Sequence, residues 1–248
     1  EADGDKRREL HLKAIKSYRR VITQPRAHTP GWGYASYMLG WLHAAAGDTT
    51  SALTAMSLAA RVVHPKARVD VRDEARAAFS WLFAQSGDPK RAFDELHAIS
   101  NDSGRSIRNT LSAMNVLVER YVAAGKFAEA GWVLRDLSRR QPSSACHHQT
   151  RAIAALRRGS DKNAVMQAAT ELMKLAEILP DKHHEKASCA EASARTLLGS
   201  GQAWMREAVG DGKSKGTGDQ RTLHLAERML HNAIASFRQE QLNGWGIC

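Results

Sequence analysis

The sequence has almost none of the patterns that predict β-strands: no alternating run of Val, Ile, Thr and Tyr is bounded by a two-residue glycine turn. No apolar run approaches the roughly 18 residues that a membrane-spanning helix needs, so we expect no transmembrane segment in this chain. Aromatic residues make up only 6% of the chain, and only three cysteines are present. These absences argue against a β-rich fold, a membrane-embedded protein and a disulfide-dense scaffold.

The 248-residue chain does contain enough apolar residues for a core, together with an excess of positive charge. Hydrophobic residues make up 43% of the chain and charged residues 25%, which argues against intrinsic disorder. The formal net charge of +10 favours acidic partners, nucleic acid or anionic membrane surfaces. Because the first residue is Glu1, we expect a processed or trimmed chain, and the lack of a signal peptide does not indicate a compartment.

Helix signals run through the whole chain. Apolar residues and alanines recur at spacings of three, four and seven positions, with charged residues on the remaining face, which predicts roughly eleven helices. We expect tight turns between antiparallel helices wherever a glycine stop is followed by a helix start. Four such places occur, at Gly47-Asp48, Gly87-Asp88-Pro89, Gly125-Lys126 and Gly159-Ser160-Asp161.

The four turns are evenly spaced, with their first glycines 40, 38 and 34 residues apart. Such a period predicts a repeat of helix pairs. In three successive units, small and large apolar residues return five, nine and twelve positions after the turn glycine: Ala52, Met56 and Ala59; Ala92, Leu96 and Ile99; Ala130, Leu134 and Leu137. We expect the alanines to allow close approach of two helices and the larger residues to fill the remaining space.

This pattern resembles the tetratricopeptide repeat, a helix-turn-helix hairpin. The third unit matches best, and the residues at the spacing of the family's signature are Leu117, Tyr121, Gly125, Ala130, Leu134 and Pro142. The first full unit is similar but has His43 where tyrosine is usual. The resemblance implies an all-α fold in which helical hairpins stack as a right-handed solenoid. It also implies a concave surface, lined by the first helices of successive repeats, that binds an extended peptide or a helix.

We therefore expect residues 1–248 to form a single tetratricopeptide-like solenoid domain. Residues 6–24 are interpreted as a half repeat whose first helix lies before Glu1. The expected hairpins span residues 31–64, 68–100, 106–142 and 143–180, and an atypical C-terminal hairpin spans 182–242. The resemblance is specific over residues 34–142.

Two tryptophans stand at the same place in adjacent repeats, because Trp41 and Trp81 each lie six residues before the turn glycine. Neighbouring aromatic side chains supply rigid contact area at a low entropic cost, as peptide-binding surfaces require. The repeat register places six candidate partner-binding residues on the expected concave face: Tyr34, Tyr37, Trp41, Trp81, Asn115 and Glu119. Asn115 could pair with an extended backbone. The alternative is that the aromatic rings pack between helices.

Two histidine pairs lie near cysteines, in Cys146-His147-His148 and in His183-His184 upstream of Cys189. Zinc binds thiolate and imidazole, but this spacing matches no standard module, so we predict neither a metal site nor a cofactor. One disulfide among the three cysteines and three free thiols are both open alternatives. A bridge between Cys146 and Cys189 would tie the fourth and fifth hairpins together and would indicate an oxidising compartment.

The segment 210–219 contains Gly212-Lys213-Ser214, as a phosphate-binding loop does. However, Glu207 stands where that motif requires glycine, and a helix precedes the segment instead of a strand. We therefore interpret it as a flexible loop. No Ser-His-Asp or paired-carboxylate arrangement stands out, so we expect no catalytic residues and no enzymatic activity.

Taken together, these features predict a non-enzymatic scaffold or adaptor that binds a protein or peptide partner in its concave groove. The positive net charge would suit an acidic partner. Richness in alanine and arginine suits a bacterial protein, and analogy with similar repeat proteins suggests a cell-envelope machine. The periplasm or cell envelope is therefore favoured over the cytoplasm. The alternative is a basic helical-repeat protein that binds nucleic acid. That alternative depends on net charge alone, since no reading helix or arginine-rich tail is recognisable.

Overall fold

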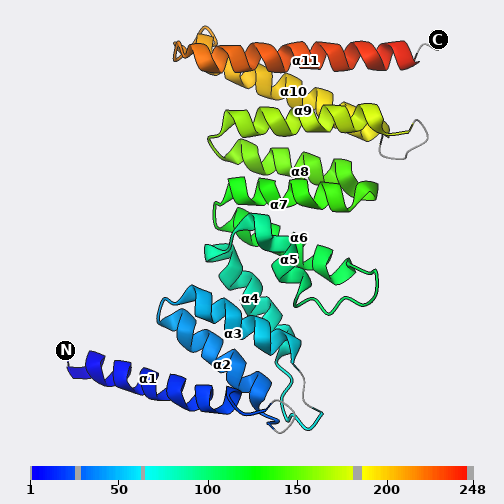
Figure 1. Ribbon diagram of the computed structural model, residues 1–248. Coiled ribbons are helices and arrows are strands. Elements are labelled where there is room, and N and C mark those ends of the chain that lie inside the picture. The colour runs from blue at the N-terminus through cyan, green and yellow to red at the C-terminus, as the bar shows by residue number, and fades with distance from the viewer. Residues whose placement is uncertain (1, 26–28, 63–64, 181–185, 245–248) are drawn as a thin grey trace. The chain divides into compact units, whose positions relative to one another are not determined.

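The computed structural model describes residues 2–25, 29–62, 65–180 and 186–244, which form α-helices that pack in the order of the chain (Figure 1). The only β-type pairing among the described residues is an isolated bridge between Gly210 and Lys215. The expectation of an all-α fold is therefore confirmed. The chain divides into two compact units, Glu1–Arg120 (unit 1) and Tyr121–Cys248 (unit 2). The right-handed solenoid and the single domain stay predictions.

Unit 1 is built by successive packing of helices along the chain. Its helices are α1 (Ala2–Ile22), α2 (Trp32–Ala45), α3 (Thr49–Arg61), α4 (Arg72–Ser86), α5 (Ala92–His97) and most of α6 (Arg108–Ala123). α1 packs on α2, α2 on α3 and α3 on α4. The indole Nε1 of Trp32 donates a 3.0 Å hydrogen bond to the carbonyl oxygen of Ile22, which fastens the start of α2 to the end of α1.

The second expected hairpin, 68–100, has an unusually short second helix. α5 has 6 residues and follows the 3-10 turn Pro89–Arg91, whereas α3 has 13 residues. The loop after α5 carries Asp102, whose carboxylate accepts 2.9 Å hydrogen bonds from the backbone N–H groups of Asn109 and Thr110. Asp102 thus caps the start of α6 from outside the helix. Burial acts to raise the pKa of Asp102, but these hydrogen bonds and one from the Thr110 hydroxyl outweigh it and lower that pKa.

The four expected turns are confirmed, and each joins the end of one helical segment to the start of the next. Asp48 and Asp161 cap the helices that follow, accepting hydrogen bonds of 3.0 and 3.1 Å from the N–H groups of Ser51 and Ala164. Gly47 and Gly125 have φ angles of +79° and +73°. Glycine adopts this left-handed conformation without the strain that a Cβ would cause.

The repeated apolar positions form the interior, as the spacing predicts. All nine residues at the three repeated offsets are at most 2% exposed, and Ala52, Ala92 and Ala130 are each 0% exposed. Burial of these small side chains is consistent with close helix approach, and the larger residues at the neighbouring offsets fill the space between helices.

Unit 2 continues the same sequential packing with longer helices. They are α7 (Phe127–Arg140), α8 (Ala145–Arg158), α9 (Lys162–Ile178), α10 (Lys186–Val209) and α11 (Gln220–Gly244). Helices α8 to α11 share a core that includes Leu172, Leu197 and Met229. Two ion pairs join separate helices: Arg135 Nε lies 2.7 Å from Glu171 Oε2, and Lys162 Nζ lies 2.5 Å from Glu207 Oε1.

The segment 210–219 between α10 and α11, which we expected to be a flexible loop, forms hydrogen bonds within itself and with the end of α10. The N–H groups of Thr217 and Gly218 donate 2.9 Å bonds to the carbonyl oxygens of Glu207 and Ala208 at the end of α10. Asp211 Oδ1 accepts bonds from Ser214 and Lys213 N–H groups, which lowers the pKa of the Asp211 carboxyl. The segment is a hydrogen-bonded turn between two helices.

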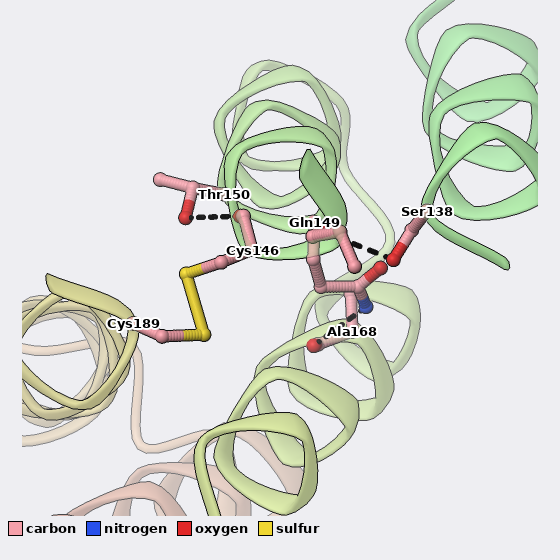
Figure 2. The surroundings of a disulfide bond; sticks show 7 residues. Ser138, Cys146, Gln149, Thr150, Ala168 and Cys189 are labelled. Atoms are coloured by element: carbon pink, nitrogen blue, oxygen red, sulfur yellow. Dashed lines mark hydrogen bonds between the residues drawn. A yellow bond between two sulfur atoms is a disulfide. The ribbon is translucent and has the colours of Figure 1, made fainter. Parts of the chain in front are cut away.

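Cys146 on α8 and Cys189 on α10 are joined by a disulfide, and both residues are buried (Figure 2). Because the sulfurs are bonded to each other, neither supplies a thiolate for zinc. The described residues contain no cluster of side chains that could hold a metal ion. The second histidine pair, His183-His184, and the third cysteine, Cys248, lie outside the described residues.

His148 lies two residues after Cys146 and is only 4% exposed. Its Nε2 is 3.1 Å from Gln141 Oε1, whereas its buried Nδ1 has no hydrogen-bond partner among the described residues. Burial lowers the pKa of His148 to about 4, and the neighbouring charges of His147 and Arg151 act in the same direction. The imidazole is therefore neutral at pH 7.

Candidate protein-binding surface

Tyr37, Trp41 and Trp81 form one group of touching rings in unit 1, which we call the aromatic cluster. Tyr37 and Trp41 lie one turn apart on α2, with ring centroids 6.2 Å apart and planes at 89°. The Trp81 ring on α4 lies 6.1 Å from that of Trp41, with planes at 44°. Edge-to-face and tilted contacts of this kind are favourable for aromatic pairs.

The rings of the aromatic cluster also remain accessible to solvent. Trp41 is 36% exposed and Trp81 is 44% exposed. By contrast, Trp32 and Trp204 are 4% and 9% exposed, as core tryptophans are. The contact between Trp41 and Trp81 therefore covers only part of each ring. Exposed apolar groups that gather at one place are typical of interaction surfaces, whereas scattered ones are not.

Helical periodicity explains why these rings face outward. On α2, Ala35 and Leu39 are buried against the unit 1 core, and Trp41 lies on the other side of the helix. On α4, Phe79 and Phe83 are buried and stack with ring centroids 5.8 Å apart. Trp81 lies midway between them in sequence and so projects away from the core.

The other three candidate residues are not brought into the aromatic cluster. Tyr34, at the start of α2, is 43% exposed and makes no ring contact with the cluster among the described residues. Asn115 on α6 is half-buried, and its Nδ2 donates a 3.0 Å hydrogen bond to Leu111 O in its own helix. Glu119 is exposed on α6. The structure therefore joins the rings of three of the six predicted residues in one cluster.

A hollow of about 460 Å³ lies between α4, α5 and α6, and none of the three residues of the aromatic cluster is among its lining residues. One of its walls is Ala77, one helical turn before Trp81, and another is Val116, which is 46% exposed. Arg76 stabilises one side by donating hydrogen bonds to Ile99 O at 2.7 Å and Asp73 Oδ1 at 2.5 Å. Sequence reasoning did not identify Val116, because it belongs to an apolar run, 116–118, whose outward residue the pattern alone does not indicate.

Comparison of the chain with protein-family models gives no match, and comparison with curated proteins gives none either. The resemblance to tetratricopeptide repeats therefore rests on the residues of this chain alone. Among the described residues, no helix combines the length and the apolar composition that crossing a membrane requires.

Proposed function

We propose that this protein is a tetratricopeptide-like interaction scaffold or adaptor, and that a segment of a partner protein binds at the aromatic cluster. The observation that carries the proposal is that Trp41 and Trp81 touch each other on adjacent helices while both stay substantially exposed. Tryptophan and tyrosine are the residues most enriched at the energetic centres of protein interfaces. Binding would bury the remaining ring surface of both tryptophans.

The test compares partner capture by the wild-type chain and by the double variant Trp41→Ala/Trp81→Ala, with captured proteins quantified by mass spectrometry. A specific partner should be recovered by wild type and lost from the double variant. The matched control is Leu10→Ala/Leu12→Ala, which removes two other exposed apolar side chains of unit 1, 57% and 59% exposed on α1. Equal recovery by wild type and the tryptophan variant would reject the proposal.

Salt dependence distinguishes this function from nucleic-acid binding, the alternative that the net charge of +10 suggests. Binding that depends on phosphate contacts weakens by orders of magnitude between about 50 and 200 mM salt. Contacts of apolar rings with a protein segment are much less sensitive to salt. A steep salt dependence, together with recovery of nucleic acid, would favour the alternative.

The disulfide between Cys146 and Cys189 supports an oxidising compartment as the place of action. A bacterial periplasm or cell envelope fits this chemistry and is part of the proposal. Alkylation of the chain isolated from its native compartment should leave both cysteines unmodified, whereas modification of both would oppose this placement.

A further inference from the structure

A groove in unit 2 lies between the C-terminal halves of α7 and α9, with the first residues of α8 at its base. Its volume of about 550 Å³ is in the size range of small binding sites. Ser138 of α7, Gln149 of α8 and residues of α9 line it, and Figure 2 shows how these three helices lie relative to one another. We call it the α7–α9 groove, and the function proposed for unit 1 does not use it.

The polar groups at one end of the groove are paired with one another. Arg135 Nε on α7 donates a 2.7 Å hydrogen bond to Glu171 Oε2 on α9. The buried Gln149 donates 3.0 Å hydrogen bonds from its Nε2 to the same carboxylate oxygen and to Ala168 O. This end of the groove therefore links three helices and carries no uncompensated charge.

The other end of the groove is apolar and open to solvent. Ile178, at the end of α9, is 76% exposed, the highest value among the large hydrophobic residues that the structure describes. Leu175 and Leu179 beside it are half-buried, and Pro142 with the buried Ala145 forms the facing wall. Apolar side chains that gather at one concave place are typical of interaction surfaces.

Two cations flank this apolar end, and neither is fully neutralised. Lys174 on α9 is exposed and forms no ion pair among the described residues. Arg139 on α7 shares the carboxylate of Asp136 with Arg140, at 3.3 and 2.8 Å, so one negative charge faces two positive ones. Lys174 also precedes the last turn of α9, where the helix dipole is negative. The field at this end of the groove therefore favours a negatively charged occupant.

We propose that the α7–α9 groove binds an acidic segment of a partner protein, in addition to the binding proposed for the aromatic cluster. A large apolar side chain of that segment contacts Ile178 and Leu175, and neighbouring carboxylates pair with Lys174 and Arg139. A nucleic-acid strand would supply the negative charge but no apolar side chain for the groove. Because the groove is small, it is a weaker contact than the aromatic cluster.

The concave shape favours a protein segment over a membrane. A membrane surface contacts side chains that project outward, as Ile178 does, whereas Leu175 and Leu179 are half-buried inside the groove. An inserted side chain contacts all three residues and displaces water from them. The occupant that fits both the shape and the charge is therefore a peptide that combines apolar and acidic residues.

The test selects peptides from a phage-displayed random library on the full chain, after depletion on the double variant Ile178→Ser/Lys174→Glu. Both substitutions are at exposed positions, so the variant should keep its fold. Enriched peptides should contain leucine, isoleucine or phenylalanine next to aspartate or glutamate. No enrichment, or enrichment of peptides without acidic residues, would overturn the proposal.

Fluorescence anisotropy of the best enriched peptide, synthesised with a label, then measures affinity for single variants. Ile178→Ser should weaken binding roughly tenfold, because apolar contact area is lost. Lys174→Glu should weaken it roughly tenfold or more, because a like charge then faces the peptide. A peptide with lysine in place of its acidic residues should lose affinity for the wild-type chain and regain it with Lys174→Glu. Wild-type affinity in both variants would reject the groove as the binding site.

Matched controls come from the same unit and from the aromatic cluster. Ile234→Ser on α11, at a residue that is 55% exposed, and Lys213→Glu, at an exposed lysine between α10 and α11, should leave affinity unchanged. Trp41→Ala/Trp81→Ala should also bind the peptide as wild type does, which separates this groove from the function proposed for unit 1. Binding of vesicles of phosphatidylglycerol and phosphatidylcholine that is lost in Ile178→Ser, without any peptide binding, would assign the surface to a membrane and contradict the proposal.

Discussion

Units 1 and 2 pack their helices with the same residue spacing but stabilise that packing differently. In unit 2, a disulfide ties α8 to α10, and ion pairs join α7 to α9 and α9 to α10. Unit 1 contains no cysteine, and ion pairs such as Lys13–Glu9 and Arg76–Asp73 lie within single helices. Unit 1 instead leaves the aromatic cluster exposed.

This difference separates two uses of the same architecture. The disulfide limits the conformations that unit 2 can adopt when it is unfolded. The ion pairs between helices stabilise its folded packing. The aromatic cluster of unit 1 keeps apolar surface in water, and burial of that surface is available only when a partner binds. We therefore expect perturbations of stability to be largest in unit 2 and perturbations of partner binding to be largest in unit 1.

Removal of the disulfide should have the largest effect on stability. The bridge closes a loop with a sequence separation of 43 residues. Loop-closure entropy for such a length corresponds to about 4 kcal/mol of unfolding free energy. The double variant Cys146→Ala/Cys189→Ala should lose that amount in unit 2, with little change in unit 1. Hydrogen exchange measured peptide by peptide distinguishes the units, and Cys248→Ala is the control. Equal loss of protection in both units would remove the contrast between them.

Acidification should also act mainly on unit 2, through His148. Its pKa is lowered to about 4 in the folded chain, so between that value and its ordinary pKa near 6.5 the unfolded chain binds more protons. Stability is therefore fully present above the ordinary pKa and falls as the pH decreases, by up to about 3 kcal/mol.

Urea unfolding of unit 2 near neutral pH and at about pH 4.5 measures this dependence. His148→Gln should flatten it, because the substituted side chain does not titrate in this range. His147→Gln, at the exposed neighbouring position, should keep most of it. The same pH dependence in His148→Gln as in wild type would assign the effect to other groups.

Overpacking at the small repeated positions should have a moderate effect of similar size in both units. Ala52 in unit 1 and Ala130 in unit 2 are each 0% exposed. Ala52→Leu and Ala130→Leu should each cost about 1 to 3 kcal/mol. The urea midpoint measures the loss, and Ala128→Leu, at an exposed position of α7, should change it little. An unchanged midpoint for Ala130→Leu would remove that residue from the contact between helices.

The sequence predicted those parts of the fold that depend on local signals. Glycine with aspartate or proline ends one helix and starts the next, so the turns at Gly47 and Gly159 were recognisable. The equal offsets of Trp41 and Trp81 predicted neighbouring rings, because a repeat places equal offsets side by side. These features need only the spacing of residues along the chain.

Features that depend on several distant segments were not predictable in this way. The cap that Asp102 provides for α6 involves residues that are separated by a loop. The disulfide joins Cys146 to Cys189, and their spacing in the sequence alone left three free thiols as an open alternative. The hydrogen bonds that organise residues 210–219 depend on carbonyl groups at the end of α10. Periodicity does not report such contacts.

The central claim is that the exposed tryptophans Trp41 and Trp81 bind a partner. Measuring partner affinity and unfolding free energy in Trp41→Ala and Trp81→Ala tests this claim most directly. Calorimetry with the captured partner should show at least roughly thirtyfold weaker binding for each variant. Urea unfolding should show a loss of no more than about 1.5 kcal/mol for Trp81→Ala, the value of one aromatic pair, and of no more than about 3 kcal/mol for Trp41→Ala, which also loses its contact with Tyr37. A loss of about 3 to 5 kcal/mol in stability, as for core tryptophans, without an independent loss of affinity would contradict the account.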